Sequence, residues 1–357
     1  MARFSYGGQA LIEGVLMRGR TAIAVALRHP DGRIVWADET LAVGFRATRW
    51  ARLPFVRGLV VLYETLVVGT RWLVRSAGIA AVEELAPMEL AQPAPSALNP
   101  AADPADVQDA ADADATPPPT PAAPLADSAD LGKGAVALML GLTLVVGVGL
   151  FFFLPLLLAK AIAGGQSGVV ERAVEGVIQI AIFLGYLLLI GRTSDVRRTF
   201  QYHGAEHMTI HALEAGDPLT VDAVRRYPTA HPRCGTEFLV VVILVSIVVF
   251  SVVGRQAIPV MVASRIVLIP VIAGISYELL RFGARHRDSR IVRWIFEPGI
   301  WVQKITTKQP TDDMLEVAIV SLEQALLADG EALPDGAGRI GRSPMILSGR
   351  ASPEVEA

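Results

Sequence analysis

Four long apolar segments constrain this chain more than any other feature of its sequence. They run over about residues 135–159, 174–190, 236–253 and 257–280. Each segment has the length of about 17 to 25 residues that a helix needs to cross a ~30 Å hydrocarbon layer. Inside a bilayer the backbone polar groups must be satisfied within the segment, which favours helices. We therefore predict a mainly α protein, a polytopic membrane helical bundle with about four transmembrane helices and the lipid bilayer as its partner.

The placement of arginine predicts how the bundle is oriented. Arginines concentrate between the second and third apolar segments and again after the fourth, whereas the other connections carry few basic residues. Basic loops stay in the cytoplasm, so these two regions and both chain termini are predicted to be cytoplasmic. Cys234 is the only cysteine, so no intrachain disulfide can form and nothing indicates an oxidising compartment.

The region before the apolar segments is predicted to contain two smaller units. In residues 1–54, the segment 22–28 indicates a strand, HPDG indicates a turn, and a second strand follows, so we expect a small β-containing unit. Residues 55–80 form an amphipathic helix with one charged stripe. This pattern favours a helix in the membrane interface over a fifth span whose stripe faces the bundle interior. The stripe consists of Arg57, Glu64, Arg71 and Arg75.

The remaining boundaries follow from composition. Residues 86–132 are mostly Ala, Pro and Asp and cannot bury a core, which predicts a disordered linker; a partner-binding segment is the alternative. Residues 133–281 hold the membrane bundle, with a cytoplasmic His-rich segment at 192–235. Residues 282–330 are predicted to form cytoplasmic helices, and 331–357 a disordered tail. Within the spans, Arg265 and Glu278 are expected to snorkel or to pair with each other.

Four of the six histidines lie between residues 203 and 231. If residues 196–215 are helical, several ionisable side chains share one face, because offsets of 3, 4, 8 and 11 residues return close to the starting direction. Imidazoles at positions i and i+4 can chelate one ion. The residues on this face are His203, Glu206, His207, His211 and Glu214.

The segment from His203 to His207 fits the pattern H-x-x-E-H, in which two histidines bind a metal and the glutamate activates water. A third ligand has to come from elsewhere, and three protein ligands make an open catalytic site whereas four make a closed structural one. The sequence leaves both forms open. It also leaves open that the histidines only cap helices, pair with carboxylates or lie near acidic headgroups. The candidate further ligands are His211, Glu214, His231, Cys234 and Glu237.

Cys234 has two interpretations of its own. It is either a buried thiol at the entrance of the third span, or a ligand or nucleophile. A helix that begins near Thr236 is expected to lower the pKa of the Cys234 thiol and to favour the thiolate.

Five sequence segments carry a resemblance to a known family. They are GGQALIEGVLMRG, YHGAEH, HPRCGTEFL, ISYELLRF and EPGIWVQKITTKQPTDDMLEVAI, and they resemble the YqhQ-like bacterial membrane proteins (domain of unknown function 1385). The resemblance covers most of the chain outside the acidic linker and the tail. It implies a metal-dependent enzyme of unknown reaction. The positions that match are Gly7, Gly8, Gln9, Glu13, Gly14, Arg18, Gly19, His203, Glu206, His207, His231, Cys234 and Gly235.

Together these features predict a multi-pass protein of the bacterial cytoplasmic (inner) membrane with a metal site on its cytoplasmic face. The expected ion is a divalent metal, zinc, with His203 and His207 as ligands and His231 or Cys234 completing the set. Glu206 is the expected general base of a hydrolase. Glu13 is an accessory candidate, because its glycine-flanked loop could fold against the histidines.

The sequence also admits two functions other than the hydrolase. The first is a non-enzymatic membrane scaffold or assembly factor, in which a structural metal or a hydrogen-bonded His cluster fastens the loop to the bundle. The second is metal transport, which ranks last because the spans offer almost no ligands. No nucleic-acid partner is expected, and a homo-oligomer is possible.

Overall fold

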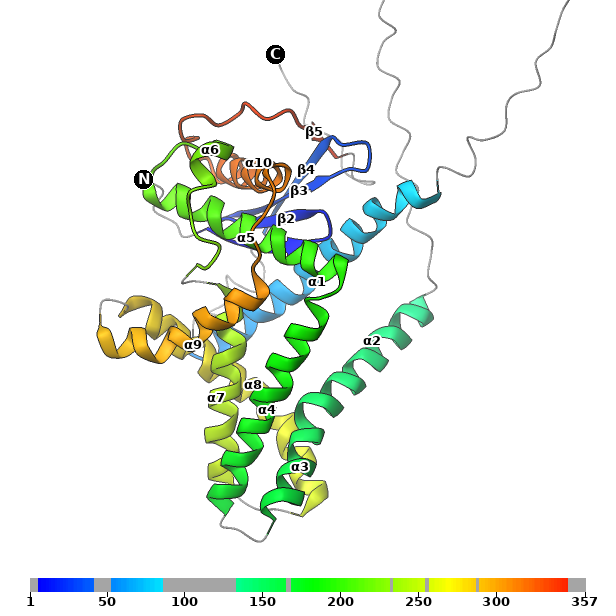
Figure 1. The fold of residues 1–357 in the computed structure, drawn as a ribbon, viewed down its shortest axis with the longest axis vertical. Coiled ribbons are helices and arrows are strands. Elements are labelled where there is room, and N and C mark those ends of the chain that lie inside the picture. Colours follow the sequence, from blue (N-terminus) through cyan, green and yellow to red (C-terminus); the bar gives the residue numbers. More distant parts are fainter. Residues whose placement is uncertain are drawn as a thin grey trace, which may run out of the picture.

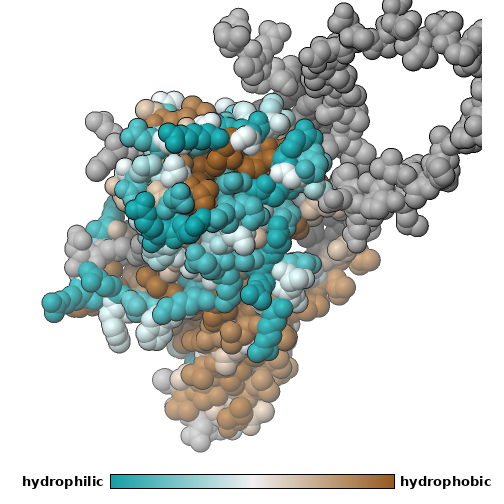
Figure 2. All heavy atoms as spheres, turned by 45° about the horizontal axis from the view of Figure 1, so that its top comes forward, coloured by the Kyte–Doolittle hydropathy of each residue, from teal (hydrophilic) through white to brown (hydrophobic). Residues whose placement is uncertain are grey.

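The computed structural model describes residues 6–41, 53–85, 133–164, 168–231, 234–253, 257–286 and 289–345. The predicted linker at 86–132 and the end of the predicted tail, 346–357, lie outside the described residues. Within them the chain is mainly helical, with a small β-sheet, and divides into a polar body and an apolar helical stem (Figure 1). Figure 2 shows the same division, with hydrophilic residues over the body and hydrophobic residues over the stem.

The stem holds four helices that are long and apolar enough to cross a membrane: Gly141–Ala163, Val170–Ile190, Gly235–Val253 and Ala263–Arg285. They correspond to the four predicted spans, so the predicted fold class is confirmed. In the labels of Figure 1 the first span covers the second half of α2 (Lys133–Val148), the π-helical turn Gly149–Phe153 and α3 (Leu154–Ala163). The others are α4 (Gly168–Ile190), α7 (Gly235–Val253) and α8 (Ile258–Arg285).

A proline explains the irregular turn in the first span. Pro155 has no N–H group, so the carbonyl of Phe151, four residues earlier, lacks its usual helical partner. The side-chain amide of Gln179 on α4 donates a hydrogen bond of 3.2 Å to that carbonyl. A polar side chain of one span thereby satisfies the backbone of the next, as the absence of water in a bilayer requires.

The charged residues of the spans find partners that the sequence did not indicate. Arg265 binds Glu175 of α4 and lies over the ring of Phe250, with 4.5 Å between its guanidinium carbon and the ring centroid. Glu278 binds Arg57 at the start of helix α1 (Val56–Leu85). The expected pairing of Arg265 with Glu278 is therefore wrong, because each lies beside a different helix.

The polar body is built on a five-stranded sheet with the strand order β1-β2-β3-β4-β5. The first four strands are antiparallel: β1 (Gly7–Leu11), β2 (Gly14–Arg18), β3 (Ala22–Arg28) and β4 (Ile34–Thr40). The predicted hairpin is present as β3 and β4. The short strand β5 (Ser343–Pro344) pairs in parallel with β4, so the predicted tail contains ordered chain up to residue 345.

Both faces of the sheet are covered, which is why β3 is a continuous apolar run. Two of its three alanines, Ala24 and Ala26, join a core with α5 (Ser194–Ala215) and α10 (Asp312–Ala328). The larger Ile23, Val25 and Leu27 point to the other face and pack against α1. The hydroxyl of Ser321 on α10 donates to two strand carbonyls, which the small alanines allow to approach closely.

Helix α1 turns its charged stripe toward the protein. Arg57 binds Glu278, Glu64 binds Arg18 of β2, and Arg71 binds Glu39 of β4. The face next to this stripe exposes apolar side chains: Tyr63, Leu66, Val67 and Val74. Helix α9 (Arg290–Thr306), which connects the stem to α10, likewise exposes Trp294 and Trp301. The rest of the body consists of the short helix α6 (Val221–Val224) and the loops around it.

Candidate metal centre

Helix α5 carries the His-rich motif, and its sequence explains where the helix ends and which side is buried. It ends at Gly216, whose φ of 78° is the left-handed conformation that commonly terminates a helix. Tyr202, Ala205 and Met208 bury one side of α5 in the core shared with the sheet and α10. The other side, with the histidines, faces the loop that returns from α6 toward α7.

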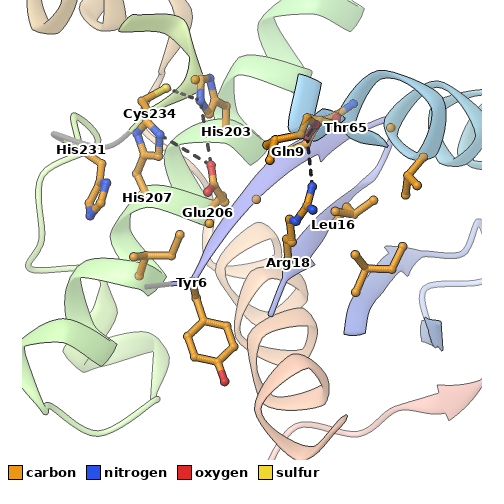
Figure 3. A pocket seen from close by; sticks show the side chains of 18 of the residues that line it. Tyr6, Gln9, Leu16, Arg18, Thr65, His203, Glu206, His207, His231 and Cys234 are labelled. Atoms are coloured by element: carbon orange, nitrogen blue, oxygen red, sulfur yellow. Dashed lines mark hydrogen bonds and ion pairs between the residues drawn. The ribbon is translucent and has the colours of Figure 1, made fainter. Parts of the chain in front are cut away.

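His203, His207 and Cys234 form a cluster in which the possible ligand atoms lie within 4.8 Å of one another. The Cys234 sulfur is 3.3 Å from Nε2 of His203, and the two imidazole centroids are 4.5 Å apart. His207 and Cys234 are buried and His203 is half-buried. Figure 3 shows all three side chains converging at one end of a cavity.

Backbone carbonyls set the orientation of both imidazoles. Nδ1 of His203 lies 3.0 Å from the carbonyl oxygen of Thr306, and Nδ1 of His207 lies 2.6 Å from that of Thr229. A carbonyl can only accept, so each Nδ1 donates its proton and each Nε2 keeps its lone pair. Metal-binding histidines typically use this arrangement, because a bond at one ring nitrogen directs the other toward the ion.

Burial sets the protonation of two of these side chains. Burial lowers the pKa of His207 to about 2, with neighbouring His203 acting in the same direction, so this imidazole stays neutral. Burial also raises the pKa of Cys234 to about 12, against the hydrogen bonds that it shares with Thr236. The expectation of a thiol acidified by the helix end is therefore wrong, because burial outweighs the helix N-terminus. A metal ion would displace the thiol proton.

Glu206 lies against the cluster on the side of the sheet. One oxygen of its carboxylate is 3.6 Å from Nε2 of His207 and 3.9 Å from Nε2 of His203. Glu206 is buried, and burial raises the pKa of its carboxyl to about 7, while His203 and the backbone N–H of Gly8 lower it. The carboxylate is thus beside the three possible ligands without belonging to their cluster.

His211, Glu214 and His231 form a second cluster, one to two turns further along α5. His231 Nε2 lies 3.4 Å from a Glu214 oxygen, and the backbone N–H of His231 donates to Gln303 at 2.9 Å. Nε2 of His211 lies 3.0 Å from the carbonyl oxygen of Ala230. The structure therefore divides the predicted ligands into two sets, with Cys234 beside His203 and His207, and His231 beside His211.

Two accessory candidates, Glu13 and Glu237, belong to neither His cluster. Glu13, whose φ is 55°, binds Arg198 and accepts a hydrogen bond of 3.2 Å from Tyr202 on the opposite side of α5. It fastens the β1–β2 turn to the helix and does not fold against the His cluster. Glu237 is buried on the first turn of α7 and packs under Gly299 of α9.

The cavity beside the cluster has a volume of about 260 Å³ and extends over the edge of the sheet to α1 (Figure 3). Its far end contains Gln9, Arg18 and Thr65, and Arg18 donates to Thr65 at 3.1 Å and to Glu64 at 3.0 Å. Reasoning from the residues alone missed Gln9 and Arg18, and only the family resemblance pointed to them. Thr65 carried no signal, because a threonine on an amphipathic helix is unremarkable.

Four membrane-length apolar helices below a polar body define a polytopic membrane protein with a buried His/Cys/Glu site at the junction between stem and body. Residues 53–328 match the model of a family described as a protein of unknown function (DUF1385), and the chain belongs to that family. It is 30% identical to the uncharacterized protein YqhQ of Bacillus subtilis (strain 168) over 330 residues, which cover 90% of this chain and 92% of that relative. No solved structure matches the chain.

Proposed function

We propose that this protein is a zinc-dependent hydrolase that acts at the cytoplasmic surface of the bacterial inner membrane. The observation that carries the proposal is the shared orientation of His203 and His207. Both Nδ1 atoms bond to backbone carbonyls, so both Nε2 atoms are left to meet the sulfur of Cys234. Two imidazoles and one thiolate suit zinc, and three protein ligands leave a fourth position for water.

When bound, the ion supplies a Lewis acid that lowers the pKa of a water molecule. Glu206 is placed to accept a proton from that water as it attacks the carbonyl carbon of an amide or ester. The same carboxyl can return the proton to the leaving nitrogen or oxygen, so that one water is consumed and one bond is broken. A pKa near 7 suits both steps, because a general base works best when its pKa is close to the ambient pH.

The alternative is a membrane scaffold in which the same histidines only fasten the returning loop. The second cluster favours this alternative, since His211 and His231 already contact Ala230 and Glu214 within the protein. The two functions differ in what a substitution does. In the scaffold, His203→Ala unfolds the loop or lowers the amount of protein; in the hydrolase it leaves a folded protein that has lost its metal.

Elemental analysis of the purified full-length protein tests the proposal. Wild type is expected to hold close to one zinc per chain, and His207→Ala only a small fraction of that. His29→Ala is the control, because His29 lies on the surface beside Asp31. Thermal unfolding, measured in parallel, separates loss of metal from loss of fold. A wild-type protein without near-stoichiometric metal would overturn the proposal.

A further inference from the structure

Among the strands that the structure describes, β1 forms the edge of the sheet on the side of the metal centre. Within these residues β1 pairs with β2 alone, with Gly7 opposite Arg18 and Gly8 opposite Met17. An edge strand presents backbone N–H and C=O groups that are not used within the sheet, and these groups can pair with another extended chain. Most proteins cover or shorten such an edge.

Two hydrogen bonds show which way this edge faces. The backbone N–H of Gly8 donates to the carboxylate of Glu206, and the N–H of Ile12 donates to the hydroxyl of Ser76 at 3.2 Å. Outward groups recur every second residue along a strand, so Gly8 and Ile12 belong to the same outward set. At Gly8 the edge of β1 therefore faces α5 and Glu206, beside the cluster of His203, His207 and Cys234.

The edge strand has two consecutive glycines, and therefore no side chains, where it faces the cavity. Gly7 and Gly8 both line the cavity, and Gly8 is exposed. A Cβ atom added at Gly7 would meet nothing within 4 Å, so the packing of the protein does not require glycine there. Glycine inside a strand lacks packing and weakens it, and it often marks a place where another backbone approaches closely.

The rest of the cavity offers apolar surface beside this edge. Leu16 and Ile23 of the sheet line it from one side, and Val61 and Val68 of α1 from the other. Arg18, the charged residue of this wall, is held by Glu64 and Thr65. The site thus combines, in order, two imidazoles with a thiol, a backbone edge, and a wall that suits apolar side chains.

We propose that the substrate of this site is a peptide, bound in extended form beside the Gly7–Gly8 edge of β1. Its N–H groups donate to outward carbonyl oxygens of that edge, because the N–H of Gly8 already donates to Glu206. Pairing of a peptide with a sheet edge gives affinity through main-chain hydrogen bonds, and side pockets give selectivity. The edge directs the paired chain past Glu206, which places a peptide bond beside the metal ligands. This inference rests on the proposed metal-dependent hydrolysis and assigns its substrate class.

Binding of three hydroxamates to the zinc-loaded, full-length protein in detergent tests the inference. Acetohydroxamate probes the metal alone, a leucyl-leucine hydroxamate adds a peptide main chain, and lauroyl hydroxamate adds an alkyl chain. The dipeptide compound is expected to bind more than tenfold tighter than acetohydroxamate. Methylation of its backbone nitrogen is expected to weaken binding by about threefold to tenfold, the value of one hydrogen bond.

Gly7→Val provides the matched change in the protein. The valine side chain enters the cavity at the edge. The variant is therefore expected to bind the dipeptide hydroxamate at least tenfold more weakly, while its zinc content and its affinity for acetohydroxamate stay unchanged. Gly341→Val is the control, because Gly341 also has open space at its Cβ but lies outside the cavity. Thermal unfolding of both variants verifies that they are folded.

The outcomes separate the two proposals. Failure of all three hydroxamates to bind would overturn the metal centre itself. Equal affinity for the acetyl and dipeptide compounds, without an effect of N-methylation or Gly7→Val, would contradict a peptide substrate. It would not contradict the metal centre. If the lauroyl compound binds most tightly, the result would contradict a peptide substrate and favour a lipid-linked one.

Discussion

The sulfur of Cys234 lies 3.3 Å from Nε2 of His203, although the two residues are 31 positions apart. The loop that brings them together is held by the histidines themselves. His207 bonds to the carbonyl of Thr229 and His211 to that of Ala230, just before the chain reaches Cys234. The imidazoles therefore have two tasks, since one ring nitrogen fastens the loop and the other is free to meet an ion.

Cys234→Ser is expected to lower zinc affinity more than tenfold while the protein stays folded. A serine hydroxyl is nearly the same size as a thiol but is a much weaker zinc ligand at neutral pH. Competition with a chromogenic zinc chelator measures the affinity. Because Cys234 is the only cysteine, this variant also shows directly whether any thiol contributes to binding. Unchanged zinc affinity would remove Cys234 from the ligand set.

Glu206→Gln is expected to keep the metal and to lose turnover. The amide preserves the shape of the side chain and its acceptor for the N–H of Gly8, but it cannot take a proton from water. Loss of a general base costs about a hundredfold to ten-thousandfold in rate. Zinc content and cleavage of a fluorogenic peptide mixture are measured on the same preparation. A variant that loses its zinc would instead identify Glu206 as a ligand.

The sequence predicted the spans and the His-bearing helix well, because each depends on local pattern. The four spans follow from apolar length, and the spacing of His203, Glu206 and His207 on one helix face follows from helical periodicity. These features need no knowledge of distant neighbours.

The sequence could not predict features that depend on contacts between distant segments. Strands β1 and β2 have five residues each and contain glycines, so alternation of polar and apolar residues is too short to recognise. Division of the ligands into two clusters depends on the path of the loop through Thr229 and Ala230, where the bonds are made to backbone carbonyls that any residue type supplies. The position of Glu13 was equally unpredictable, since its partner Arg198 lies 185 residues away in the sequence.

Asp329→Ala is expected to destabilise the polar body at neutral pH by about 1–3 kcal/mol, since it removes a charged acceptor of four hydrogen bonds. Asp329 accepts hydrogen bonds from the hydroxyl of Tyr6 at 3.0 Å, from the N–H of Arg20 at 2.6 Å, and from the N–H and hydroxyl of Thr21 at 2.8 and 2.7 Å. It thereby joins the end of α10 to the start of the sheet.

The effect of Asp329→Ala is expected to depend on pH. Burial raises the pKa of Asp329, but the hydrogen bonds from Thr21, Arg20 and Tyr6 outweigh it and hold the pKa below its usual value. A lowered pKa stabilises the fold above the unfolded-state value of about 3.9, and this stabilisation is lost as the pH falls through the folded-state value. Thermal unfolding between pH 7 and pH 3 should show the gap between wild type and variant narrowing below about pH 4. Asp312→Ala, which alters an exposed pair with Arg225, is the control and should change little.

The predicted orientation can be tested with single cysteines in a Cys234→Ser background. Lys160 lies in the last turn of α3, at the far end of the stem from the exposed Asp312 at the start of α10 (Figure 1). The arginines that cluster around the polar body predict that this body is cytoplasmic. Lys160→Cys should therefore react with a membrane-impermeant maleimide in intact spheroplasts, and Asp312→Cys only after the membrane is permeabilised. Both substitutions replace exposed side chains, so folding should be preserved. Labelling in the reverse order would place the metal centre on the outer surface, and labelling of both sites in intact spheroplasts would contradict a stem that crosses the membrane.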